Sequence, residues 1–218
     1  MNCKNFLGRV RISVFLISVL LFIGCETPIS DSAGPEVVTS PYETISWQDD
    51  GTGYIRWYTN DPQYISDIGY SEWEFYDPVQ TPMTSVEVEV KKVSGDPYMG
   101  YGIVFCLQDG TNYLTVNIDT LGFYRIAKYS NGSSTDIVSW MSSDYLFQGY
   151  GVKNTIQVDY NSTNAQFTLS FNGSSATTFK DTSATPFSDG RSGFLIGVSD
   201  TENFPDEPVD VRFRRLQP

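Results

Sequence analysis

The stretch that decides the fold runs over residues 100–134 and reads GYGIVFCLQDGTNYLTVNIDTLGFYRIAKYSNGSS. Runs of β-branched and aromatic residues alternate in it with Asp-Gly, Leu-Gly and Asn-Gly pairs, which accept the positive φ of tight turns. This pattern predicts a meander of hairpins. The four strands are expected at about residues 99–107, 112–119, 122–129 and 135–140.

Apolar residues recur with a period of two outside this stretch as well. In residues 85–93, Val86, Val88 and Val90 should face one side of a strand, while the charged residues between them face the other. Similar alternation runs through residues 155–160, 166–171 and 208–216. Because no segment beyond residue 24 has a helical period, we expect an all-β, two-sheet antiparallel sandwich.

The composition excludes several classes of function. The 218 residues include no histidine, which excludes a Ser-His-Asp triad, a Cys-His pair and imidazole zinc ligands. Residues 1–24 carry three basic and no acidic side chains, so the formal charge of the remaining chain is −12 − 3 = −15. Phosphate backbones repel such an acidic chain, and we expect no nucleic-acid partner.

The amino terminus has the pattern of an export signal. Three basic residues precede an apolar run of 12 residues that ends at Ile23, too short to cross ~30 Å of hydrocarbon as a helix. Gly24-Cys25 resembles the lipobox of bacterial lipoproteins, although Phe22 stands where that family usually has Leu. The resemblance implies that residues 1–24 are a signal peptide and that Cys25 receives acyl chains such as palmitate.

The rest of the chain then divides into two parts. Residues 25–43 are expected to be the lipidated cysteine and a flexible tether, and residues 44–218 a single β-sandwich domain. The protein would be exported to the bacterial cell envelope, with a membrane as its partner through the lipid. Only Cys106 would remain for the folded domain, and its apolar neighbours predict a small core residue.

Four segments together resemble a known superfamily. The stretch already quoted, followed by KNTIQVDYNSTNAQFTLSFNG, GRSGFLIGVS and VDVRFRRL, is similar to the concanavalin A-like lectin/glucanase superfamily, in particular its laminin-G-like and keto-disaccharide-hydrolase-related jelly rolls. The likeness covers about residues 44–218. It implies a jelly roll with one convex and one concave sheet, the concave face often binding a glycan.

Candidate glycan-binding residues lie on one side of the meander. Leu114, Val116 and Ile118 should enter the core, which turns Tyr113 and Asn117 the other way, and the next strand offers Arg125. A sugar needs an aromatic ring against its apolar face and amide or guanidinium groups for its hydroxyls. The alternative is that Tyr113, Asn117 and Arg125 are ordinary residues of a solvated sheet face.

Two carboxylates are the candidates for catalysis. Glu87 and Glu89 share a strand face ~7 Å apart, a separation within the range of glycoside hydrolysis. Glucanases of the superfamily continue this alternation with a third acid, whereas Lys91 stands here. The alternative is an exposed strand face with a lysine that discourages edge pairing.

Acidic turns are the candidates for a structural calcium, the one cofactor we consider. Carboxylates there supply hard oxygen ligands, but no loop has the twelve-residue pattern of alternating ligands. The candidate ligands are Asp49, Asp50, Asp200 and Asp206. The four tryptophans could form a stacking platform or belong to the core.

These observations predict a lipid-anchored envelope protein with a non-catalytic β-sandwich that binds carbohydrate or another envelope polymer. Two alternatives stay open: a hydrolase or lyase acting on glycans, and a purely structural interaction module.

Overall fold

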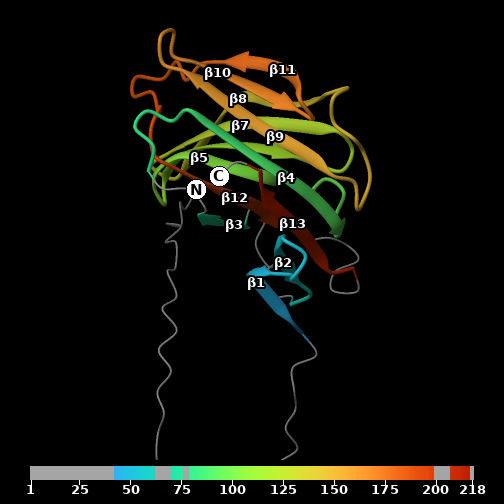
Figure 1. The fold of residues 1–218 in the computed structure, drawn as a ribbon. Helices are drawn as coiled ribbons and strands as arrows, with labels where there is room; N and C mark the ends of the chain where they lie inside the picture. Colours follow the sequence, from blue (N-terminus) through green and yellow to red (C-terminus); the bar gives the residue numbers. More distant parts are fainter. Residues whose placement is uncertain (1–41, 62–69, 76–78, 199–206, 217–218) are drawn as a thin grey trace, which may run out of the picture. The chain divides into compact units, whose positions relative to one another are not determined.

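The computed structural model describes residues 42–61, 70–75, 79–198 and 207–216, and every regular element among them is a strand (Figure 1). The strands form a seven-stranded sheet in the order β1-β2-β13-β4-β9-β10-β11 and a six-stranded sheet in the order β3-β12-β5-β6-β7-β8, with antiparallel pairing. Their bounds are β1 Thr44–Asp49, β2 Ile55–Thr59, β3 Tyr70–Phe75, β4 Ser85–Ser94, β5 Tyr101–Asp109, β6 Asn112–Ile118, β7 Phe123–Ser130, β8 Ser133–Ser142, β9 Asn154–Asn161, β10 Gln166–Phe171, β11 Ser174–Phe179, β12 Arg191–Val198 and β13 Val209–Arg215. The predicted all-β, two-sheet antiparallel fold is confirmed, and the predicted meander is β5 to β8.

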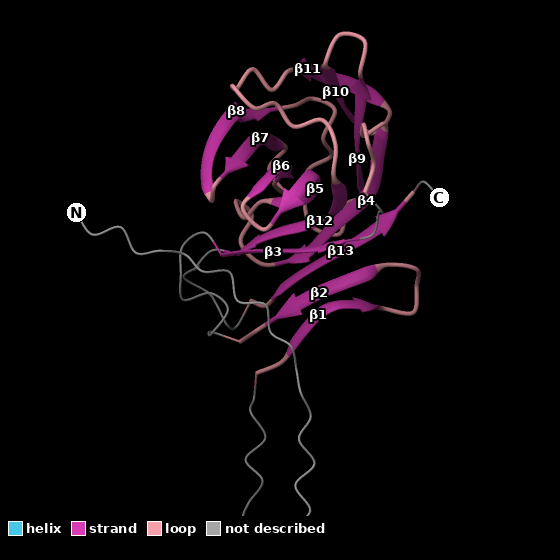
Figure 2. Cartoon of the chain, turned by 90° about the vertical axis from the view of Figure 1, so that its left-hand side faces the viewer, coloured by secondary structure: helices cyan, strands magenta, loops and turns pink. Residues whose placement is uncertain are grey.

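The two sheets face each other across one apolar core (Figure 2). Its residues are supplied by the alternation that the sequence predicts, in β4 and β6 among other strands. The inward residues of these two strands are buried: Val86, Val88, Val90, Leu114, Val116 and Ile118. The predicted assignment of faces is therefore confirmed in both sheets.

Two hairpin turns have the geometry that their Asn-Gly pairs predict. Asn131 and Gly132, between β7 and β8, have φ angles of 51° and 77°. Asn172 and Gly173, between β10 and β11, have φ angles of 52° and 79°. Two consecutive residues with positive φ match the twist of the flanking strands, which fixes the register of each hairpin.

Cys106 is a core residue, as predicted. Its thiol is free and buried, and burial raises its pKa far above the ordinary value. It lies where the pairing of β5 with β6 shifts register, with a φ of 50°.

One end of the core is closed around a buried ammonium group. Lys92 follows the inward residues of β4 and is 0% exposed. Its Nζ donates to the carbonyl oxygens of Asp96 and Met99 in the β4–β5 loop. Burial lowers the pKa of Lys92 to about 7, against the opposing attraction of Asp96 and Asp119.

The opposite end is closed by a buried ion pair. Lys128 of β7 donates to Asp181 at 2.6 Å, and their side chains are only 7% and 3% exposed. The same ammonium donates to the Ser183 hydroxyl and to the Thr185 carbonyl, both at 2.6 Å. Burial by itself would raise the pKa of Asp181, but hydrogen bonds that it accepts from Lys128, from Ser183 and from the Phe187 amide outweigh burial and lower the pKa. The β11–β12 connection is therefore tied to the sandwich through one charge.

The predicted signal peptide, Cys25 and the predicted tether up to residue 41 lie outside the described residues. Among the residues that are described, no helix is long and apolar enough to cross a membrane.

Breaking the Lys128–Asp181 pair on one side should destabilise the fold strongly. Asp181→Asn leaves a buried ammonium without its counter-charge, and we expect a loss of about 3–5 kcal/mol in the free energy of unfolding measured with urea. The double variant Lys128→Met/Asp181→Leu should lose much less, because it leaves no orphaned charge. Equal losses in the two variants would contradict this role.

Lys92 should give the fold a specific dependence on pH. The unfolded chain keeps this lysine protonated up to its ordinary pKa of 10.5, whereas the folded chain releases the proton near 7, so the unfolded state binds more protons between these values. The stability of the native chain relative to Lys92→Met should therefore rise as the pH increases from about 7 towards 10, in urea titrations of both proteins. A difference that does not change with pH would show that Lys92 keeps its proton.

Candidate ligand-binding face

The three residues predicted to bind a ligand lie on one face of the six-stranded sheet. Tyr113 and Asn117 alternate with the core residues of β6, so they point away from the other sheet. Asn117 pairs with Arg125 of β7, and Tyr113 pairs with Tyr129. We name this surface the outer six-stranded face; the structure brings all three predicted residues onto it.

Tyr113 is largely covered within this face. It is 6% exposed, and its ring is stacked on that of Tyr129 with centroids 4.5 Å apart. Val104 and Leu107 of β5 pack beside the two rings. Burial, and to a smaller extent the neighbouring Tyr129, raises the pKa of the Tyr113 phenol. Tyr113 therefore supports Tyr129 and offers little of its own ring to a ligand.

Arg125 and Asn117 carry the polar groups of the face. The Arg125 Nε donates to Asp136 of β8 at 2.6 Å, and the pair keeps 20% and 33% of its two side chains exposed. Burial lowers the pKa of Arg125, but the bond and charge of Asp136 outweigh it and the net pKa is raised. Asn117 donates to the Thr115 hydroxyl at 3.2 Å.

A β-bulge in β8 adds Trp140 to this surface. Ser139 and Trp140 together lie opposite the single residue Arg125, because the β7–β8 pairing shifts there. A bulge changes the direction of the side chains around it. The Trp140 side chain is 44% exposed, whereas Trp57 is fully buried and Trp47 packs against the core. Of the four tryptophans, the Trp73 side chain is not described.

Two glycines at the start of β5 allow close packing beside the Trp140 ring. A Cβ at Gly100 would lie 3.4 Å from Cη2 of Trp140 and 3.2 Å from Oδ1 of Asn117. The indole thus reaches from β8 over the ends of β7 and β6 to Gly100. A Cβ at Gly102 would lie 2.2 Å from the Val116 carbonyl oxygen, so a side chain cannot be placed there. An exposed ring, an amide and an ion pair therefore lie together on the outer six-stranded face.

The two candidate catalytic carboxylates lie on the outward face of the other sheet, where they share a side of β4 as predicted. Glu89 accepts hydrogen bonds from Tyr54 and, at 2.9 Å, from Arg214, and lies 3.5 Å from Lys153. Burial alone would raise the pKa of Glu89, but these partners outweigh it and lower the pKa. An ionised, fully engaged carboxylate is poorly suited to act as a general acid. Glu87 lies on the same side of β4, half-buried.

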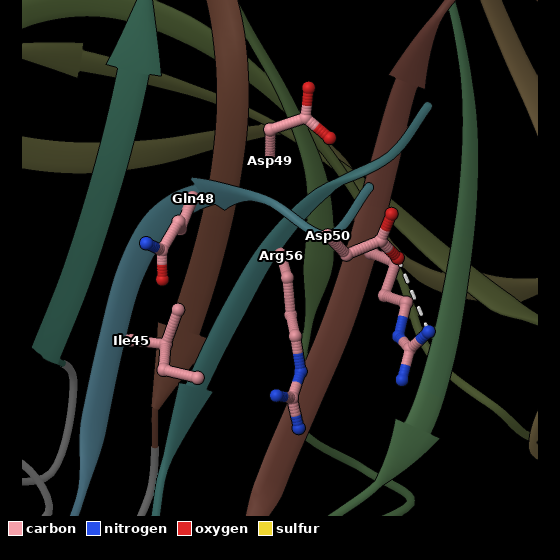
Figure 3. A pocket seen from close by; sticks show the side chains of 6 residues that line it. Ile45, Gln48, Asp49, Asp50 and Arg56 are labelled. Atoms are coloured by element: carbon pink, nitrogen blue, oxygen red, sulfur yellow. Dashed lines mark hydrogen bonds and ion pairs between the residues drawn. The ribbon is translucent and has the colours of Figure 1, made fainter. Parts of the chain in front are cut away.

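A shallow hollow of about 370 Å³ opens over β1, β2 and β13 (Figure 3). Asp50 pairs there with Arg212 at 3.2 Å, and hydrogen bonds from Thr52 are the main cause of its lowered pKa. Asp49 accepts from the Gly51 amide at 2.8 Å. The hollow is lined by Ile45, Gln48, Asp49, Asp50, Arg56 and Arg212.

Two of the four predicted calcium ligands, Asp49 and Asp50, line this hollow. The oxygens of Asp49 and Asp50 already accept hydrogen bonds from their own turn, and Asp200 and Asp206 lie outside the described residues. Within the described part of the chain, no three His, Cys, Asp or Glu side chains come together in a metal-binding arrangement. A structural calcium stays a prediction from the sequence.

Comparison with known proteins identifies the fold and no more. No protein-family model matches the sequence. No curated protein matches it either. Among solved structures, the carbohydrate-binding module CBM66 from Bacillus subtilis has a TM-score of 0.56 at 12% identity, covering 79% of this chain and 91% of its own.

Two further structures are more distant. A β-glucanase from Bacillus licheniformis has a TM-score of 0.46 at 13% identity, covering 81% of this chain and 92% of its own. The homodimeric agglutinin CG-16 from chicken liver has a TM-score of 0.42 at 15% identity, covering 66% and 99%. With the two-sheet topology, the first superposition shows that the chain has the predicted jelly-roll fold.

Proposed function

We propose that this protein is a carbohydrate-binding β-sandwich, exported and held at a membrane by a lipid on Cys25, and that its ligand binds on the outer six-stranded face. The observation that carries the proposal is the exposed indole of Trp140, which lies beside Asn117. A pyranose ring can lay its apolar C–H face on such a ring.

The polar groups around Trp140 suit sugar hydroxyls. The Asn117 amide both donates and accepts, while Arg125 donates and Asp136 accepts within one ion pair. That pair leaves 20% and 33% of the two side chains exposed, so a ligand can reach it.

The proposed activity is binding without catalysis. Among the carboxylates considered for chemistry, Glu89 is engaged by Tyr54, Arg214 and Lys153 on the opposite sheet. Asp136, on the proposed binding face, is engaged by Arg125. The lowered pKa of Glu89 keeps it ionised, whereas glycoside hydrolysis requires a protonated general acid.

Removing the indole should weaken glycan binding. On a glycan array probed with the full chain, Trp140→Ala should reduce the affinity for the best-bound glycan about tenfold, since a lost stacking contact is worth about 1.4 kcal/mol. Asn117→Ala should weaken binding in the same direction. Tyr58→Ala, which removes an aromatic ring from β2 in the other sheet, should leave binding unchanged.

The same array separates the alternatives. Loss of glycan binding in the presence of a chelator would support the predicted calcium site. Release of reducing sugar by the native chain, abolished in Glu89→Gln, would contradict the non-catalytic proposal. If the folded chain binds no glycan, the sandwich is a structural or protein-binding module instead.

The lipid anchor makes a separate prediction. The chain expressed with its own amino terminus in a bacterial host should be recovered with membranes, and mass spectrometry of its first peptide should find acylated Cys25. Cys25→Ser should release the protein from the membrane fraction, because the acyl chains supply the anchoring. A mature chain that begins at another residue and carries no acyl group would contradict the proposal.

A further inference from the structure

Exposed apolar side chains gather at one end of the sandwich. Eight of the eleven large ones among the described residues lie at the end where β4 and β8 finish and β7 begins, or on the β4–β5 and β8–β9 loops. We name four of them, on the β4–β5 and β8–β9 loops, the aromatic rim: Tyr98, Tyr145, Phe147 and Tyr150. Tyr98 is 71% exposed and Phe147 56%. Exposed apolar groups that cluster in this way mark an interaction surface.

Hydrogen bonds hold the loops of the aromatic rim together. The Gly149 amide donates to the Thr120 carbonyl at 2.8 Å, and the Thr120 amide donates to the Pro97 carbonyl at 3.1 Å. The Tyr150 hydroxyl donates to the Gly95 carbonyl. The β4–β5 loop, the β6–β7 turn and the β8–β9 loop therefore form one ordered surface that presents the rings.

The chain reaches the sandwich at this same end. Thr44, the first residue of β1, pairs with Thr59, and Thr59 pairs with Val209 of β13. Val209 in turn lies against Gly95, at the start of the β4–β5 loop, within 3.2 Å of where a Cβ on that glycine would be. The amino-terminal segment thus joins the fold beside the aromatic rim and not at the Lys128 end.

The length of that segment limits how far the sandwich can lie from a lipid on Cys25. The tether predicted for residues 26–43 has a root-mean-square span of roughly 5–6 Å × √18, about 23 Å. This span is shorter than the ~33 Å length of a ten-residue strand such as β8, so the lipid lies closer to this end of the sandwich than to the other. Attachment at this end therefore favours contact between the aromatic rim and the lipid surface.

The charged groups near the aromatic rim indicate which lipid headgroups the rim can contact. Burial, followed by the nearby carboxylates of Glu207 and Asp96, raises the pKa of Tyr150, and Asp144 is exposed in the β8–β9 loop. Carboxylates repel anionic headgroups, whereas tyrosine rings favour the boundary between water and hydrocarbon in any bilayer. A zwitterionic surface fits both properties.

We propose that the aromatic rim rests in the headgroup region of a zwitterionic bilayer and so fixes the orientation of the sandwich on its membrane. This inference rests on the lipid anchor in the proposed function and is independent of the glycan site.

Site-directed spin labelling tests the orientation on the full lipid-anchored chain. Cys106 is buried and Cys25 would be acylated, so a new cysteine can be labelled alone. Nitroxides at Tyr98→Cys and Phe147→Cys, in phosphatidylcholine vesicles, should lose accessibility to a water-soluble nickel chelate and gain accessibility to oxygen. The matched control is Ala184→Cys, in the β11–β12 connection at the opposite end, whose label should stay accessible to the chelate.

Each other outcome overturns the inference. Rim labels as accessible to the chelate as the Ala184 label would show that the rim stays in water, and rim labels shielded by an added glycan but not by vesicles would make it a sugar surface. If Cys25 carries no acyl chain, vesicle flotation decides: flotation lost in Tyr98→Ser/Phe147→Ser supports the rim, and no flotation overturns it. Glycan binding is measured on the same samples, so that failure of the proposed carbohydrate function can be told apart from failure of the proposed orientation.

Discussion

Two buried ammonium groups, one at each end of the core, are the constraint on which the sandwich depends. A charge between two apolar sheets is tolerated only when oxygen atoms surround it. Lys92 takes carbonyl oxygens from the β4–β5 loop, and Lys128 takes a carboxylate, a hydroxyl and a carbonyl from the β11–β12 connection. Because the loops supply these oxygens, neither loop can move away without leaving a charge unpaired inside the protein.

Fixing the ends in this way determines what the loops can present. The β4–β5 loop wraps around Lys92 through its backbone, so Tyr98 is turned outward. On the sheet faces, charged side chains form ion pairs: Glu89 pairs with Arg214 on one sheet, and Arg125 pairs with Asp136 on the other. What distinguishes the outer six-stranded face is an exposed indole next to such a pair.

Much of this could be predicted from the sequence, because alternation in β4, β6, β9 and β10 identifies the inward face directly. The same alternation extends to Lys92, two residues beyond Val90, so its burial was indicated although its charge argued against it. The position of Trp140 could not be predicted, since a bulge breaks the period at that point. The exposure of Tyr113 depends on Val104 and Leu107, beside the register shift in β5, and a pattern within β6 contains no information about them.

The cluster around Tyr54 shows a second limit of sequence reasoning. Lys91, Lys153 and Arg214 lie over its ring with separations of 4.2, 5.7 and 5.0 Å to the centroid. They are distant in the chain: Lys91 lies in β4, Lys153 directly before β9 and Arg214 in β13. The strand order β2-β13-β4-β9 brings them together. From sequence, Glu89 therefore looked like half of a catalytic pair, whereas the fold makes it the counter-charge of this cluster.

The proposed glycan site and the aromatic rim meet at Trp140, and their geometry links the two proposals. The aromatic rim lies at one end of the strands. A sandwich that rests on the rim therefore has its strand axes upright on the membrane and its outer six-stranded face perpendicular to the bilayer. A polymer bound across β8, β7 and β6 would then run parallel to the membrane, close to its surface. A freely tumbling sandwich would have to orient before each binding event. A sandwich fixed by its aromatic rim presents Trp140 and Asn117 at a constant height above the membrane. This lowers the entropic cost of binding a polymer that is already attached to the same envelope.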